Sequence, residues 1–245
     1  MELKNIFKME MFKNRNDKPY LLVIAILTAM AAVASIVGVL MIEGLIHSDM
    51  STLLVIEILL VVFTVIGLFI FSLLYPFHLL NVDYKNKVIS LIFASGVSRG
   101  KFYFVKISAT ILSTLIAVFV ILFIPMVTFL IAYTDVFVGA VQNIIANFSS
   151  SDIVSVLLSA TIGFVASIVM LTTAVIITKG KTSGIFLFFG FSFAVSTVQS
   201  MFSVPLFFSM ENFTNLYFNL ATIFSIIQIV VFVLIGLNVL KKQNL

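Results

Sequence analysis

The sequence predicts an all-α membrane protein with six membrane-spanning helices. Apolar residues make up 62% of the 245 residues and charged residues only 10%, which is far from the usage of soluble domains. The apolar residues form six separate runs, each longer than the ~20 residues that cross the hydrocarbon layer of a bilayer. Because backbone polar groups find no water there, we expect each run to be a helix.

The gaps between the runs alternate in charge, and this predicts the topology. All fourteen Lys and Arg residues lie before the first run, in the second and fourth gaps, or after the last run, whereas the other three gaps hold only acidic charges. Short cytoplasmic loops retain Lys and Arg, so we expect both termini to be cytoplasmic. The predicted spans are residues 19–42, 52–80, 107–132, 153–178, 182–208 and 216–240.

The six spans and their short connections use nearly the whole chain, so we expect residues 1–245 to form a single transmembrane domain without a soluble catalytic part. Residues 1–18 are basic and suggest a helix lying at the membrane interface. The alternative is a basic segment that only anchors the topology. The apolar face of such a helix would carry Leu3, Ile6, Phe7 and Met11.

The gap over residues 81–106 is the most informative stretch of the sequence. Asp83 can cap a short helix near its start, Gly96 can end that helix, and Ser98 can cap the helix that follows. The pattern therefore predicts an amphipathic helix on the cytoplasmic side, between the second and third spans. It either rests on the bilayer or docks in a groove of a cytosolic partner. At helical spacing, its apolar face would carry Tyr84, Val88, Leu91 and Ile92.

This gap, from Asp83 through the Ser95–Arg99 turn to Lys106, resembles the first cytoplasmic loop of permease subunits of ABC type-2 exporters. In that family an acidic residue opens a coupling helix, a turn ending in Val-Ser-Arg follows, and a Lys starts the third span. The six-span layout and the basic N-terminus are also similar. Two features depart from the family pattern: Asp83 replaces the more usual Glu, and Asn86-Lys87-Val88 stands where a Gly-Thr step is common.

The resemblance implies that a separate ATP-binding cassette subunit, with its own ATP and Mg²⁺, drives the export of apolar or amphipathic peptides. Similar compact permeases serve Gram-positive bacteriocin immunity and the export of toxins such as phenol-soluble modulins. A second permease, identical or a sister chain, would complete the transporter in the bacterial plasma membrane. The residues expected to contact the ATP-binding subunit are Asp83, Tyr84, Lys87, Val88, Leu91, Ile92, Ser95, Gly96, Ser98 and Arg99.

Other residues argue against chemistry within the chain. Two His and no Cys give no metal-ligand pattern, and no base is placed to activate a nucleophile. We therefore expect no enzyme activity, no cofactor and no nucleic-acid binding. Gly180-Lys181-Thr182 echoes a phosphate-binding loop, but Val175 stands where the first Gly of that motif is required.

Glu57 is the one carboxylate within a predicted span, and intramembrane charges are functional candidates. It either lines an outward transport path or lies close enough to the surface to reach water. The alternative function for the whole chain is a self-contained carrier or channel.

Overall fold

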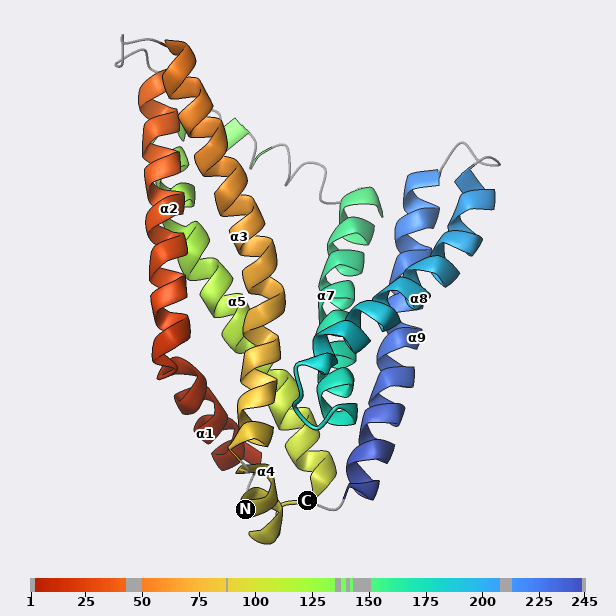
Figure 1. The fold of residues 1–245 in the computed structure, drawn as a ribbon. Helices are drawn as coiled ribbons and strands as arrows, with labels where there is room; N and C mark the ends of the chain where they lie inside the picture. Colours follow the sequence, from red (N-terminus) through yellow and green to blue (C-terminus); the bar gives the residue numbers. More distant parts are fainter. Residues whose placement is uncertain are drawn as a thin grey trace. The chain divides into compact units, whose positions relative to one another are not determined.

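The computed structural model describes residues 3–42, 50–86, 88–134, 138–139, 142, 151–207 and 213–243, and within them it contains helices and no strands. Figure 1 shows their arrangement along the chain. The helices are α1 (Leu3–Arg15), α2 (Lys18–Ile42), α3 (Met50–Lys85), α4 (Val88–Ala94), α5 (Arg99–Ala132), α7 (Ser151–Ile177), α8 (Ser183–Phe207) and α9 (Phe213–Lys242).

Six of these helices, all except α1 and α4, are long and apolar enough to cross a membrane. This confirms the all-α class and the six predicted spans. The helices also expose large apolar side chains, such as Phe69 at 75% and Phe193 at 77% exposed. Exposed apolar surface of this extent is unfavourable in water and suits a lipid surrounding. The chain is a multi-pass membrane protein by these criteria.

Two helices extend beyond the predicted spans at the same connection. The prediction ended the second span at residue 80 and began the third at residue 107, whereas α3 continues to Lys85 and α5 begins at Arg99. Only α4 and a few residues on either side of it therefore connect the two long helices. The helices extend this far because Asp83, near the end of α3, forms an ion pair with Lys106, near the start of α5.

The chain divides into two compact units. Unit 1 comprises Met1–Glu10, Pro76–Ile111 and Ile145–Leu245, and unit 2 comprises Met11–Tyr75 and Leu112–Ile144. The helices α1, α3 and α5 each contribute to both units.

In unit 1, α7 packs along α9, and α8 contacts both. Gly236 permits the close approach of α9, since a Cβ at this position would lie 3.0 Å from Thr173 Oγ1. The Thr173 hydroxyl also donates a hydrogen bond of 2.9 Å to the carbonyl of Phe232. Polar groups that find partners on neighbouring helices are a common means of holding helices together in a membrane.

In unit 2, α2 packs against α3. A Cβ at Gly67 would lie 2.8 Å from Leu27 Cδ2, so the glycine allows close contact. The rings of Tyr20 and Tyr75 lie 5.2 Å apart between their centroids. A hydrogen bond of 2.9 Å from Asn14 to Ser113 joins α1 to α5.

Candidate functional site

The short helix α4 lies between the end of α3 and the start of α5, and one of its faces is buried. Ile89 is 3% and Ile92 9% exposed, and both belong to an apolar cluster with Ile6, Val97 and Phe102. We name this group, completed by Val105, the α4 cluster. It anchors α4 to the start of α1 and to α5 within unit 1.

The opposite face of α4 is exposed, and here the predicted apolar stripe is wrong in part. Leu91, which was expected to share a face with Ile92, is 69% exposed. The prediction ran one helical phase from Tyr84 through Ile92, whereas α3 ends at Lys85 and α4 begins afresh at Val88. Within α4, Ile89 and Ile92 are three residues apart and share the buried face, whereas Leu91 lies about 100° from Ile92 around the helix.

The predicted boundary between α4 and α5 is confirmed. Gly96 has a φ of +84°, the left-handed conformation that commonly ends a helix and favours glycine. The Ser98 carbonyl accepts a hydrogen bond of 3.1 Å from the N–H of Phe102, as the residue preceding a helix does. Ser95 Oγ donates to the carbonyl of Ile92 at 2.7 Å, which satisfies one carbonyl at the α4 end.

Asp83 does not cap α4 as expected. It lies inside the last turn of α3 with 0% exposure, and its carboxylate forms an ion pair with the ammonium of Lys106 from α5. The same ammonium donates to Glu10 Oε2 of α1 at 2.8 Å. We name Glu10, Asp83 and Lys106 the ion cluster. Because the Lys106 ammonium offsets part of the charge of the two carboxylates, α3 and α5 continue as helices past residues that look like loop positions in the sequence.

The ion cluster joins three elements through one residue. Lys106 and Glu10 are 4% and 1% exposed. Removing one partner of such a buried group leaves an uncompensated charge, which destabilises by about 3–5 kcal/mol. The cluster therefore holds α1, α3 and α5 together at the base of α4, and Asp83 is not accessible to a partner protein.

The inner face of α1 also differs from the expectation. The buried residues of α1 are Ile6, Glu10 and Asn14, whereas Leu3, expected on the apolar face, is 49% exposed. Burial follows the ion cluster and the hydrogen bond to Ser113. The inward side of α1 therefore combines one apolar contact, Ile6 in the α4 cluster, with the polar contacts of Glu10 and Asn14.

Two further expected docking residues are engaged within the protein. Arg99 Nη1 donates to the carbonyl of Lys241 at 2.7 Å and of Gln243 at 2.9 Å, and the guanidinium lies 5.4 Å from the centroid of the Phe93 ring. The Tyr84 hydroxyl donates to Gln243 Oε1 at 3.3 Å. Gln243 and Glu10 are thus residues of the site that the sequence analysis missed.

The expected docking residues now divide by exposure. Ile92 and Asp83 are buried, and Tyr84, Val88 and Arg99 are half-buried. Lys87 lies outside the described residues. The acidic charges of the first, third and fifth gaps also lie outside them; these are Glu43, Asp49, Asp135, Glu211 and the side chain of Asp152. The exposed members, which form the outer surface of the site, are Leu91, Ser95, Gly96 and Ser98.

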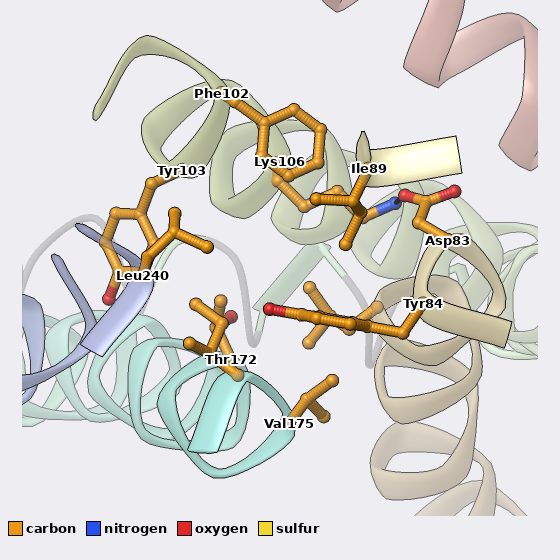
Figure 2. A pocket seen from close by; sticks show the side chains of 11 residues that line it. Asp83, Tyr84, Ile89, Phe102, Tyr103, Lys106, Thr172, Val175 and Leu240 are labelled. Atoms are coloured by element: carbon orange, nitrogen blue, oxygen red, sulfur yellow. Dashed lines mark hydrogen bonds and ion pairs between the residues drawn. The ribbon is translucent and has the colours of Figure 1, made fainter. Parts of the chain in front are cut away.

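A small cavity lies behind α4, bordered by Asp83 and Lys106 of the ion cluster (Figure 2). Figure 2 shows the Lys106 ammonium beside the Asp83 carboxylate, with the Tyr84 ring lying across the cavity towards Thr172 and Leu240. Its volume is about 20 Å³, enough for about one water molecule. The cavity has no room for a peptide, so it belongs to the support of α4 rather than to a transport path.

Glu57 lies in α3 of unit 2, away from any cationic partner among the described contacts. A Cβ at Gly38 of α2 would lie 3.0 Å from Glu57 Oε1, and Glu57 Oε2 is buried without a hydrogen bond. The glycine makes space for the carboxyl group. No group of three metal-ligating side chains exists among the described residues, and Gly180-Lys181-Thr182 lies in the turn between α7 and α8.

Comparisons with protein-family models, with curated proteins and with solved structures give no match. The function of the site is therefore argued from its geometry and from the sequence.

Proposed function

We propose that this chain is the transmembrane subunit of an ATP-driven exporter and that the outer surface of α4 docks on a separate ATP-binding subunit. The observation that supports this most directly is the construction of α4. Its inner face is fixed by Ile89 and Ile92, while Leu91 projects from the other side at 69% exposed. A partner groove that accepts Leu91 would bury an apolar side chain in the manner of helix-in-groove recognition.

In this proposal α4 lies in the cytosol. The basic residues of the N-terminal segment, of the α3–α5 connection and of the α9 end support that orientation, because short cytoplasmic loops retain Lys and Arg. The ATP and Mg²⁺ belong to the partner subunit. This chain contributes the membrane path, together with a second permease, in a bacterial plasma membrane.

Movement of the ATP-binding subunit would reach the spans through the two sets of contacts behind α4. Ile89 and Ile92 of α4 pack in the α4 cluster with Phe102 and Val105 of α5. The ion cluster links α5 to α3 directly. The proposed substrates are apolar or amphipathic peptides, which suit the apolar surfaces of the spans.

The test is purification of the tagged chain from native membranes in mild detergent. We expect an ATP-binding subunit to co-purify with the wild type and to be lost with Leu91→Asp. Leu3→Asp is the matched control, because Leu3 is also exposed but lies on α1. Retention of the subunit by Leu91→Asp, or absence of any such subunit from the wild type, would contradict the proposal.

The second candidate is a self-contained carrier, and the observation that favours it is Glu57, a carboxylate inside an apolar helix with one oxygen unpaired. Such a carrier should transport in vesicles that contain this chain alone. Its transport should respond to an ion gradient, fail with Glu57→Gln and persist with Leu91→Asp. The ATP-driven exporter should show no transport in vesicles that contain this chain alone, with or without an ion gradient.

A further inference from the structure

The end of α9 is tied to three other helices by two side chains that the proposed docking does not use. These are Gln243, which follows α9 directly, and Arg99, the first residue of α5. Both side chains donate hydrogen bonds to backbone carbonyls at helix ends. The last four carbonyl groups of a helix lack a partner within the helix.

Gln243 is 6% exposed and uses both ends of its amide. The amide nitrogen donates to the carbonyl of Ile176, in the last turn of α7. The amide oxygen accepts the hydrogen bond from the hydroxyl of Tyr84, which lies in the last turn of α3. One side chain therefore connects α9 to α7 and to α3.

Arg99 supplies the second connection. Its Nη1 donates to the carbonyls of Leu240, Lys241 and Gln243. A cation at this end of a helix also interacts favourably with the helix dipole. The start of α5 is thereby fixed to the end of α9.

The turn after α7 holds Tyr84 in place from the other side. Gly180 has a φ of +72°, and a Cβ at this position would clash with the Cβ of Tyr84 and with Asn81 Oδ1. The Gly180 N–H bonds to the carbonyl of Val175 at 3.0 Å, and the Lys179 N–H bonds to that of Ile176 at 3.1 Å, which is the Schellman ending of a helix. The Ile176 carbonyl thus serves both this turn and Gln243.

We infer that Gln243 and Arg99, with Tyr84, form a polar lock that fastens the α4 region to α7 and α9. While the lock is closed, the end of α3 and the start of α5 cannot move independently of α7 and α9. When it opens, α4 moves with α3 and α5 alone. The lock belongs to the chain itself and does not depend on ATP-driven export, although in such an exporter it would carry movement of α4 to α7 and α9.

The chemistry of the lock suits a contact that opens and closes. Its bonds involve a neutral amide, a phenol, backbone carbonyls and a half-buried guanidinium, so opening leaves no fully buried charge without a partner. The ion cluster differs, since its separation would strand two carboxylates. We expect the lock to open at a lower free energy than the ion cluster.

The absence of Cys from the chain makes a direct measurement possible. The substitutions Leu91→Cys in α4 and Lys181→Cys after α7, both at exposed positions, accept spin labels in the full chain in lipid nanodiscs. Pulsed electron resonance then gives the distribution of distances between the labels. We expect Gln243→Leu and Arg99→Lys each to broaden it. Lys242→Leu, the matched control at an exposed neighbouring position, should leave the distribution unchanged.

Hydrogen exchange gives a second readout. Loss of the Tyr84 to Gln243 bond in Tyr84→Phe should make the amides of residues 88–94 exchange about fivefold faster. Combining Tyr84→Phe with Gln243→Leu should add nothing to Gln243→Leu alone, because one bond is removed only once.

Three results would overturn the lock: an unchanged distance distribution in Gln243→Leu, unchanged exchange in Tyr84→Phe, or full additivity of the two changes. Tyr84→Phe keeps the ring and its packing, so it remains informative if Gln243→Leu fails to fold. None of these measurements involves an ATP-binding subunit. Failure of co-purification and failure of the lock are therefore distinguishable.

Discussion

The ion cluster in unit 1 and Glu57 in unit 2 place carboxylates inside the protein in opposite ways. Asp83 and Glu10 share the ammonium of Lys106, so every member of that group has an oppositely charged partner. Glu57 instead faces Gly38, with Oε2 buried and unpaired. The ion cluster therefore stabilises a junction of helices. The unpaired carboxyl group of Glu57 instead costs stability and is available for another role.

Lys106→Ala should have the largest effect, because it removes the cation from between two carboxylates. We expect a loss of about 3–5 kcal/mol in the free energy of unfolding, measured by unfolding the purified protein in mixed micelles with increasing SDS. Lys101→Ala, at an exposed position on the same helix, should change stability by less than about 0.5 kcal/mol. A loss below about 1 kcal/mol for Lys106→Ala would show that the cluster contributes no more than a surface ion pair.

Gly180→Ala and Gly67→Ala compare glycines of the two units. At Gly180 the positive φ and the clash with Tyr84 act together, and we expect a loss of about 1–3 kcal/mol. At Gly67 the only close atom is the flexible end of Leu27, and the gain in helix propensity of about 1 kcal/mol offsets the adjustment. The same unfolding titration measures both variants. A larger loss of unfolding free energy in Gly67→Ala than in Gly180→Ala would contradict this ranking of the two glycines.

Glu57→Leu should leave the fold intact or stabilise it by up to about 1 kcal/mol, because replacing an unsatisfied polar group by an apolar one of similar size is neutral or favourable. The unfolding titration of this variant is compared with that of Glu57→Gln, which keeps the polar amide. A loss of more than about 1 kcal/mol would mean that Glu57 has a structural partner.

Leu91→Asp should have the smallest effect on stability, within about 0.5 kcal/mol, because the side chain is exposed. Ile89→Asp, two positions away and 3% exposed, should prevent stable folding of the α4 region. Circular dichroism and the unfolding titration distinguish the two. Equal stability losses would show that Leu91 packs inside the protein and cannot serve as a docking residue.

The spans could be predicted from the sequence because hydropathy over twenty residues depends on no other part of the chain. The continuation of α3 to Lys85 could not, since Asp83 becomes compatible with a buried helix only when it meets Lys106. The pairing is separated by 23 residues in the sequence and extends to Glu10 across 96. No local pattern encodes such distant partners.

The short helix between the second and third spans could be expected from the sequence, but the orientations of its side chains could not. Gly96 and Ser98 carry local signals of helix ends, and both predictions are confirmed. The exposure of Leu91 depends on the packing of Ile89 and Ile92 in the α4 cluster, which the spacing of apolar residues does not reveal. Gln243 carries no sequence signal, because its role arises from bonds to Ile176 and Tyr84, distant in the chain.

The separations within the ion cluster also set an order of events during synthesis. Glu10 and Asp83 both precede Lys106 in the chain, so the two acids emerge from the ribosome before the base that neutralises them. The ion cluster therefore cannot be complete until Lys106, near the start of α5, has been translated.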